Sequence, residues 1–385
     1  MIRETMATEP IPDITRASEG PDAGSGLAPR LRLLDHLPAE ATAQLREVLV
    51  ELGEPGWRAK QVVRQAFVRR VRSFAAMTDL PVGLRERLEA RVQLPLLSLV
   101  HRAQSGDGTV KYLWSVEGGG EIESVAIPSE GRISFCISSQ VGCALHCRFC
   151  ATGALGLARN LRQGEMVDQV VAMLADMAQE PPRLSVVFMG MGEPGYNMDA
   201  VVGACRALND ADGLGIGARH LTISTSGVVP AIERLAKESL QVRLAVSLHS
   251  GHQARREALM DVATRHPLPE LLASCQVYHV ATGRNITFEY AVMRGVNDSA
   301  EDARLLAEFA AQVPSKINLI PYNPVEGFEA PASTERDAAR FRLELERHFT
   351  GDVMVRQTRG RDIEAACGML HRARKDAAVR PAAAT

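Results

Sequence analysis

The sequence has 385 residues, of which 46% are hydrophobic and 23% are charged, and its formal net charge is −2. This length suffices for one large and one smaller domain, and the balance is that of a globular protein, not a disordered or fibrous one. The seven cysteines follow no regular framework, so we expect thiols in a reducing compartment. No apolar run reaches membrane-spanning length and no signal peptide is evident, so we expect a cytoplasmic protein without a membrane partner.

The N-terminal part of the chain divides into two segments. Residues 1–30 are rich in Pro, Gly, Ala and acidic side chains without periodicity, and we expect them to be disordered. Residues 31–100 are interpreted as a helical domain, because apolar residues recur at helical spacing, as in Ala59–Val71. Between residues 57 and 91 there are nine basic and three acidic side chains. This balance is typical of phosphate-backbone binding, although a solvated helix face has the same composition.

Residues 101–128 predict short strands. Thr109–Val116 and Glu121–Ile127 are rich in β-branched and aromatic residues, and Gly118–Gly120 lies between them. Glycines at this place are typical of a tight turn. We interpret the segment as a β-hairpin linker between the helical domain and the rest of the chain.

From residue 129 to residue 370, apolar strands alternate with amphipathic helices. The predicted strands are Ile133–Ile137, Leu184–Met189, His220–Ile223, Val242–Ser247, Asn285–Ala291, Lys316–Ile320 and Val353–Arg356. The predicted helices are 164–178, 198–209, 230–237, 267–280, 300–312 and 335–348. This alternation predicts an α/β fold of βαβ units around a parallel sheet, in a partial or full barrel with its chemistry at the carboxyl ends of the strands. Residues 371–385 are expected to form a flexible tail.

Three cysteines follow the first of these strands at C-x3-C-x2-C spacing: Cys143, Cys147 and Cys150. Three thiolates can hold three corners of a [4Fe–4S] cube, which leaves one iron open for a substrate or cosubstrate. Such an open iron is what enzymes use to reduce S-adenosylmethionine (SAM). The alternative is a zinc site completed by His146, but zinc motifs rarely take this spacing in a single run. The spacing therefore predicts an iron–sulfur cluster.

Other polar residues follow the carboxyl ends of the predicted strands. Gly192 allows close backbone approach to a ligand, and the Glu193 carboxylate beside it can hold an ammonium group. Ser224, the run Ser247–His249 and Asn323 carry hydroxyl, imidazole and amide groups suited to ribose and carboxylate contacts. Taken singly, each is more typical of a turn or a strand-end cap than of a ligand contact. Their shared position at one end of the sheet favours a ligand site.

Two further cysteines attract attention. Cys136 lies on the strand that leads into the cysteine triplet. Cys367 lies far downstream, shortly after three arginines, and an electropositive setting favours the nucleophilic thiolate. Those arginines are Arg356, Arg359 and Arg361. Either cysteine can also be a small side chain without a chemical role.

From about Leu52 to Leu370 the sequence resembles the radical-SAM RNA adenosine methyltransferases, the RlmN/Cfr family. The segments that carry the resemblance are Ser138–Cys147, Met189–Pro194, Ser224–Pro230, Ser247–His249, Ile317–Pro324 and Asp362–Gly368. The resemblance implies a partial (β/α)6-type radical-SAM barrel with a small N-terminal helical RNA-binding domain. It also implies a [4Fe–4S] cluster, two SAM molecules per turnover and a low-potential electron donor such as flavodoxin or ferredoxin.

The resemblance assigns a role to each candidate residue. The cluster ligands are Cys143, Cys147 and Cys150, and the SAM site is lined by Gly192, Glu193, Ser224, Ser247, Leu248, His249 and Asn323. Cys367 accepts a methyl group from one SAM, and a radical from a second SAM removes hydrogen from it. The resulting carbon radical adds to adenine, Glu123 accepts a proton, and Cys136 attacks Cys367 to form a disulfide that frees the methylated base.

The methylated carbon and the RNA are left open by the sequence. Asp261–Arg265 departs from the usual family run, and Tyr322 stands where Trp is common in the branch that methylates C2. We expect C2 of an adenosine in 23S rRNA, with tRNA as a second target. The alternatives are C8 of adenine by the same chemistry, a radical-SAM enzyme with another substrate, and a zinc-dependent RNA-binding protein without catalysis.

Overall fold

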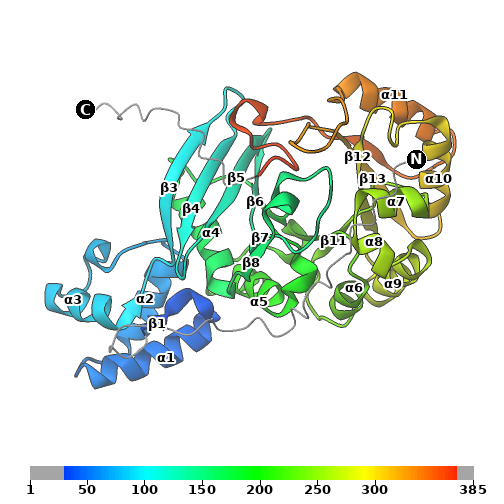
Figure 1. Ribbon diagram of the computed structural model, residues 1–385. Helices are drawn as coiled ribbons and strands as arrows, with labels where there is room; N and C mark the ends of the chain where they lie inside the picture. The colour runs from blue at the N-terminus through cyan, green and yellow to red at the C-terminus, as the bar shows by residue number, and fades with distance from the viewer. Residues whose placement is uncertain (1–29, 371–385) are drawn as a thin grey trace.

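The computed structural model describes residues 30–370, so the predicted disorder of residues 1–30 and 371–385 concerns segments that lie outside the described residues, Arg30 excepted. A small helical module begins the described chain and lies at one end of the molecule (Figure 1). Its helices are α1 (Pro38–Glu51), α2 (Arg58–Phe67) and α3 (Val82–Arg91). Helix α1 begins where the Glu40 carboxylate accepts the Leu37 N–H at 3.1 Å, a typical first-turn cap.

The helical module is shorter than the sequence suggested. Its last helix ends at Arg91, and the short strand β2 (Val92–Gln93) follows and pairs in parallel with β1 (Leu31–Arg32). Pro95 explains the difference, because a proline disfavours the helical conformation at the residue before it and offers no N–H to a helix. Strand β3 then begins at Leu97, inside the segment that we had interpreted as helical.

The predicted hairpin is present, and it is part of a larger unit. Strands β3 (Leu97–Gln104), β4 (Val110–Val116) and β5 (Glu121–Ser129) form an antiparallel meander. The glycines between β4 and β5 have positive φ angles, which only glycine adopts readily. Strand β5 pairs with β6 (Arg132–Cys136), so the meander continues the main sheet.

The main sheet has ten strands in the order β14-β13-β12-β11-β10-β9-β6-β5-β4-β3. Its parallel part consists of β6, β9 (Leu184–Phe188), β10 (Leu221–Thr225), β11 (Arg243–Ser247), β12 (Ile286–Val292), β13 (Ser315–Pro321) and β14 (Val353–Val355). Strands β14 and β3 are its two edges, so the sheet curves without closing. The predicted α/β fold with a partial barrel is confirmed.

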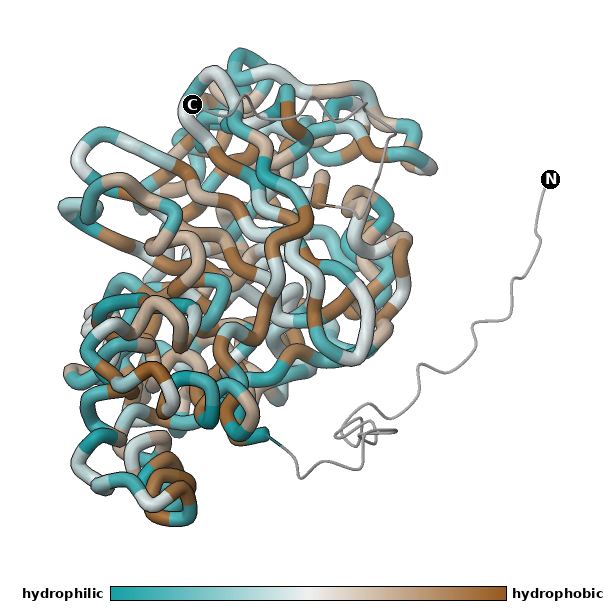
Figure 2. The backbone as a smooth tube through the Cα atoms, turned by 90° about the vertical axis from the view of Figure 1, so that its left-hand side faces the viewer, coloured by the Kyte–Doolittle hydropathy of each residue, from teal (hydrophilic) through white to brown (hydrophobic). Residues whose placement is uncertain are grey.

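Helices connect the parallel strands and cover the outside of the curved sheet (Figure 1). They are α4 (Gln163–Asp176), α5 (Met198–Asn209), α6 (Val229–Ala236), α7 (Gln253–Leu259), α8 (Val262–Arg265), α9 (Leu268–Thr282), α10 (Ala300–Ala310) and α11 (Glu335–Leu345). Apolar and polar stretches alternate along the backbone (Figure 2), and the buried apolar residues include those of the central strands β10, β11 and β12. All seven residues of β12 are buried, as expected for a parallel strand covered on both faces. Among residues 30–370, no helix combines the length and the apolar character that a bilayer crossing needs.

Candidate active site

A cavity of about 170 Å³ lies at the carboxyl ends of the parallel strands. It gathers most of the residues that the sequence singled out: Cys143, Cys147, Cys150, Gly192, Glu193, Ser224, Ser247, His249, Asn323 and Cys367. Three predicted residues, Glu123, Cys136 and Leu248, are not in its lining. Parallel strands bring their carboxyl ends to one edge, which explains how residues so distant in sequence meet there.

The three clustered cysteines lie on the loop between β7 (Gln140–Gly142) and β8 (Leu157–Asn160). The loop is anchored at its start, where the Cys143 N–H donates to the Gly156 carbonyl at 3.0 Å. Gly142 has φ +81°, and a Cβ atom there would overlap that same carbonyl. Only glycine therefore allows the chain to turn into the loop at this point.

The chemistry of the loop suits a thiolate-bound metal cluster. Burial raises the pKa of Cys143 to about 12, and burial also raises the pKa of Cys147. Buried thiols of this kind lose their protons when a metal supplies the compensating positive charge. His146, the alternative zinc ligand, is exposed. Within residues 30–370, no three His, Cys, Asp or Glu side chains converge closely enough to hold one metal ion.

Glu193 is a buried carboxylate in the loop after β9, directly before the 3-10 turn Pro194–Tyr196. Its Oε1 accepts the Gly195 N–H at 2.8 Å, and its Oε2 accepts the N–H of Ser226 at 2.8 Å and the hydroxyl of Ser226 at 2.7 Å. Burial raises the pKa of Glu193, and the hydrogen bonds oppose that rise. The side chain is thereby fixed in the cavity wall with acceptor capacity left for a cationic group.

His249 is held as a neutral ring. Its Nδ1 accepts the Ala291 N–H at 2.9 Å, which leaves the ring proton on Nε2. Burial lowers the pKa of His249 to about 3, and the nearby Arg256 charge contributes. Phe149, from the cysteine loop, packs edge-on against the ring with the centroids 4.6 Å apart. His249 can therefore offer one hydrogen-bond donor to a ligand without carrying a charge.

Asn323 provides the clearest sign that the cavity binds a polar ligand. Its side chain is 3% exposed and lines the cavity, and its Oδ1 has no hydrogen-bond partner among the described residues. A buried amide oxygen without a partner is costly, so a ligand donor is expected opposite it. The Asn323 amide and the Glu193 carboxylate can bind an amino-acid moiety, and the thiols in the same cavity can bind a metal cluster.

Cys367 reaches the cavity from the C-terminal segment, residues 356–370, which follows β14. This segment is bonded directly to the cysteine loop. The Ala151 N–H donates to the Gly368 carbonyl at 2.8 Å, and the Thr152 hydroxyl donates to the Leu370 carbonyl at 2.6 Å. The Cys367 side chain is exposed, which suits a thiol that must meet a substrate.

Arg356 links Cys367 to two buried groups. The charges of Cys367 and Cys136 both favour its cationic form and raise the pKa of Arg356. On its other side, Arg356 Nη1 lies 3.8 Å from Glu289 Oε2. Burial raises the pKa of Cys136 to about 12, the Cys367 charge adds to the rise, and Arg356 opposes it. The two thiols therefore share one counter-charge.

Glu289 is the residue that sequence reasoning missed. It lies on β12, is 4% exposed, lines the cavity and accepts a hydrogen bond from Asn318 at 2.9 Å. The available signal was a carboxylate in the middle of the otherwise uncharged strand Ile286–Val292. Burying a charge there is unfavourable unless it is paired, which points to Arg356 as its partner.

Glu123 lies on β5, away from the cavity lining. It is 3% exposed, and its Oε1 forms an ion pair with Lys111 Nζ at 3.1 Å. Lys111 Nζ also lies 3.4 Å from the Glu364 carbonyl of the C-terminal segment. Glu123 is thus connected through one lysine to the segment that carries Cys367. All seven cysteines are free, so the implied Cys136–Cys367 disulfide is not present as a bond.

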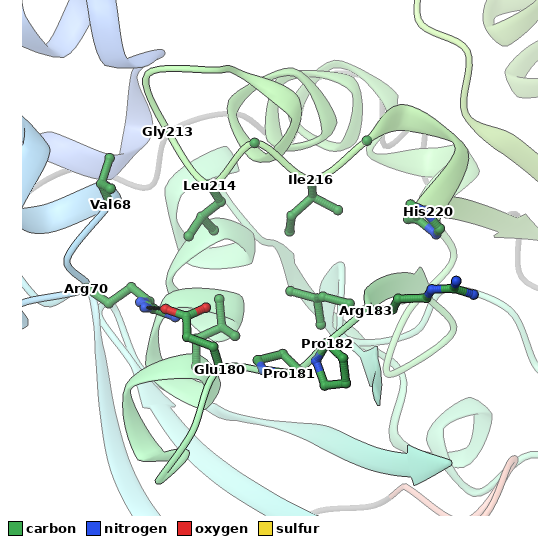
Figure 3. A pocket seen from close by; sticks show the side chains of 14 residues that line it. Val68, Arg70, Glu180, Pro181, Pro182, Arg183, Gly213, Leu214, Ile216 and His220 are labelled. Atoms are coloured by element: carbon green, nitrogen blue, oxygen red, sulfur yellow. Dashed lines mark hydrogen bonds and ion pairs between the residues drawn. The ribbon is translucent and has the colours of Figure 1, made fainter. Parts of the chain in front are cut away.

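A second hollow, of about 440 Å³, lies between the helical module and the other end of the barrel strands. None of the predicted site residues lines it. Arg70 and Glu180 point toward one another and form an ion pair at one end, whereas Arg183 and His220 lie at the other (Figure 3). This hollow therefore contributes no group to the cavity that holds the cysteines.

Comparisons with known proteins match different parts of the chain to two descriptions. Residues 137–307 match the Radical SAM superfamily. Residues 39–94 match the Ribosomal RNA large subunit methyltransferase N-terminal domain. The first range contains the cysteine loop and the second contains α1, α2 and α3.

Several known proteins are similar over most of the chain. A protein named Dual-specificity RNA methyltransferase RlmN from Anaeromyxobacter dehalogenans is 45% identical over 346 residues, which cover 88% of this chain and 91% of that protein. A protein of the same name from Pelobacter propionicus is 41% identical over 339 residues, covering 88% and 95%. The crystal structure of a radical SAM methyltransferase from Sphaerobacter thermophilus aligns with a TM-score of 0.83 at 42% identity, covering 89% and 99%.

Proposed function

Since the chain belongs to the RlmN family of radical-SAM RNA methyltransferases, we propose that it methylates C2 of an adenosine in 23S rRNA, and of an adenosine in tRNA. One observation carries the proposal. Cys367, from the C-terminal segment, lines the same cavity as the three cysteines of the β7–β8 loop. A methyl-accepting thiol beside a site for cluster and SAM is what this chemistry requires.

The donor set of the cavity fits the cofactors that the family uses. Cys143, Cys147 and Cys150 would hold a [4Fe–4S] cluster with one iron open. Gly192, Glu193, Ser224, Ser247, Leu248, His249 and Asn323 would hold SAM, with Glu193 facing the ammonium group. When bound, the cluster supplies one electron that splits SAM and so provides an oxidant for a C–H bond of a methyl group on Cys367.

Cys367 acts first as a nucleophile and then as a carrier. Its thiolate attacks the methyl carbon of one SAM and displaces S-adenosylhomocysteine, and the methyl group then stays bonded to the sulfur of Cys367. Before that transfer, the positive charge of Arg356 offsets the negative charge of the thiolate. After a hydrogen atom has been removed from the methyl group, its carbon adds to C2 of adenine. This carbon of the ring is electron-poor and does not attack a methyl donor by itself.

Glu123 and Cys136 complete the reaction. Glu123 takes the proton that leaves C2, so that the aromatic ring is restored. Cys136 then attacks the sulfur of Cys367, which forms a disulfide. The methylene group on C2 takes up a proton as the base is released with its methyl group, and the one remaining electron would pass to the bound cluster. The ion pair of Glu123 with Lys111 must open or shift for the proton transfer, because Lys111 Nζ lies 3.1 Å from Oε1 of the carboxylate that has to accept the proton.

The RNA must present one unstacked base to the cavity. A duplex cannot bring the C2 atom of an adenine into a cavity of about 170 Å³, so the target base must leave its stack. The helical module would hold the folded RNA through its backbone. An electron donor of low potential, such as a flavodoxin or a ferredoxin, would act as a second partner in the cytoplasm.

Nucleoside mass spectrometry of 23S rRNA and tRNA tests the proposal. We expect 2-methyladenosine in both RNAs from cells that have the protein, and its loss when Cys367 is replaced by Ala. Cys205→Ala is the matched control, because Cys205 is fully buried and lies outside the cavity. Finding 8-methyladenosine instead would assign the C8 reaction, and unchanged adenosines in both RNAs would exclude RNA methylation at these positions.

A further inference from the structure

The positive charge of the helical module is largely committed to internal contacts. Of the nine basic residues between positions 57 and 91, most pair with an acid or with main-chain carbonyls. Arg58 and Arg87 both pair with Glu54, and Arg91 pairs with Glu51. The sequence count therefore overstates the charge that is available to a ligand.

Helix α2 retains two cations that are not used in this way. Lys60 and Arg64 are exposed and, among the residues that the structure describes, form no ion pair. They lie four positions apart, on one face of the helix. Helix α2 contains no acidic residue, so nothing on this helix offsets their charge.

Trp57 immediately precedes α2 with helical backbone angles, three positions before Lys60 and seven before Arg64, which is the spacing of one helix face. Its side chain is 63% exposed, whereas the other tryptophan, Trp114, is 2% exposed. The Arg58 guanidinium lies 4.8 Å from the Trp57 ring centroid, and Arg58 is itself held by Glu54 at 3.5 Å. A cation over one face of the indole fixes the ring and leaves the other face to a ligand.

A third cation approaches from α1. The side chain of Arg46 fills the space beside Gly56, where a Cβ atom would lie 2.8 Å from Arg46 Cγ. Arg46 is exposed and, like Lys60, forms no ion pair within residues 30–370. Three exposed cations thus accompany one exposed aromatic ring.

We propose that the face formed by Arg46, Trp57, Lys60 and Arg64 (the stacking face) binds an unpaired stretch of the substrate RNA. Trp57 stacks on a base, and the three cations contact phosphates on either side of it. Flat rings interleaved with cations are how proteins bind single-stranded nucleic acid without reading its sequence. The inference rests on the proposed function, since it requires an RNA substrate, and it names the surface that holds this substrate outside the cavity.

Intrinsic fluorescence tests the stacking face directly in the anaerobically purified holoenzyme. Because Trp114 is buried, acrylamide-accessible emission comes from Trp57. We expect a tRNA transcript, and a mixed-sequence oligoribonucleotide, to quench this emission and to protect it from acrylamide. Trp57→Ala should weaken RNA binding at least about fivefold, and Trp57→Phe should retain most of the affinity. Val280→Ala, at another exposed apolar side chain, should leave the affinity unchanged.

The salt dependence of binding tests the cations. Lys60→Gln and Arg64→Gln should each reduce the slope of log Kd against log salt by about 0.7 to 1. Arg304→Gln is the control, because Glu301 and Glu308 already balance that charge.

Two results would overturn the inference. The first is a Trp57→Ala enzyme that binds and methylates RNA as the unchanged enzyme does, which would leave the proposed function intact. The second is Trp57 emission that responds to an acidic electron-donor protein and not to RNA. Absence of methylation by the unchanged enzyme, with RNA still protecting Trp57, would instead contradict the proposed function alone.

Discussion

At the scale of single residues, the site combines groups that the sequence reveals with groups that it hides. The cysteine triplet and Glu193 stand in short motifs whose spacing already predicts their chemistry. Glu289 stands in no motif, because the neighbour that explains it, Arg356, is far along the chain. Two residues so far apart in the sequence cannot be recognised as a pair from the sequence. The pairing of β12 with β13, and of β13 with β14, brings Glu289 and Arg356 close together.

Arg356 is expected to control the reactivity of Cys367. The charges of Arg356 and Cys367 interact, so in Arg356→Gln the alkylation of Cys367 by iodoacetamide at pH 8 should slow. The measurement is the rate of label incorporation at Cys367 by peptide mass spectrometry, which does not require a loaded cluster. Arg359→Gln is the control, since Arg359 bonds to the neighbouring Gln357. Equal rates in the Arg356 variant and the unchanged enzyme would show that the guanidinium leaves the thiol unaffected.

At the scale of elements, periodicity located the parallel strands and the helices between them to within a few residues. Periodicity did not predict the secondary structure correctly where pairing with a distant strand determines it. Strand β3 pairs with β4 across its length, and this pairing extends the chain at residues that we had interpreted as helical. The short helices α7 and α8 were not predicted, because segments of seven and four residues are too brief for a periodic pattern to emerge.

Helix α4 joins the helical module to the barrel through one buried carboxylate. Asp168 accepts the N–H groups of Leu96 and Leu97 at 2.9 and 2.8 Å and pairs with Arg72 at 3.0 Å. Asp168→Ala leaves these donors unpaired in the interior, so the free energy of unfolding should fall by about 3–5 kcal/mol in urea titrations.

The matched control for this prediction is Glu180→Gln. Glu180 pairs with Arg70, two positions before Arg72, but the Glu180 side chain is largely exposed. An exposed ion pair contributes little, so that variant should lose under about 1 kcal/mol. Similar losses in the two variants would show that burial does not distinguish the two contacts.

At the scale of the whole molecule, the C-terminal segment forms hydrogen bonds with two distant parts of the chain. Besides its bonds to the cysteine loop, the segment meets the β3–β4 turn. The Gly360 N–H donates to Asp107 Oδ2 at 3.0 Å, and the Ser105 hydroxyl donates to Asp362 at 2.6 Å. No local pattern in the sequence predicts this docking, because the partners are more than two hundred residues apart.

Asp107 should determine how firmly the segment is docked. Burial opposes ionisation, but hydrogen bonds from Thr109 and Gly360 prevail and lower the pKa of Asp107 to about 2. In Asp107→Asn we therefore expect faster hydrogen exchange across residues 357–370 and a loss of about 1–2 kcal/mol in the free energy of unfolding at pH 7.

The pH dependence follows from the direction of this shift. The folded-state pKa of Asp107 lies below the ordinary value of 3.8, so its stabilising effect is complete above pH 3.8 and disappears as pH falls toward 2. The difference between the Asp107→Asn variant and the unchanged protein should shrink over that range. The exposed Asp212, changed to Asn, should show no such difference, and a gap that persists at pH 2 would contradict the assignment.

The position of Cys367 beyond β14 has a consequence for biosynthesis. A ribosome completes every strand of the barrel before it adds Cys367, the proposed methyl acceptor. If Cys367 carries the methyl group as proposed, a nascent chain can fold its cysteine loop early and still be unable to methylate the RNA of the ribosome that is making it. On this proposal, activity begins only when the C-terminal segment has bonded to the cysteine loop and to the β3–β4 turn.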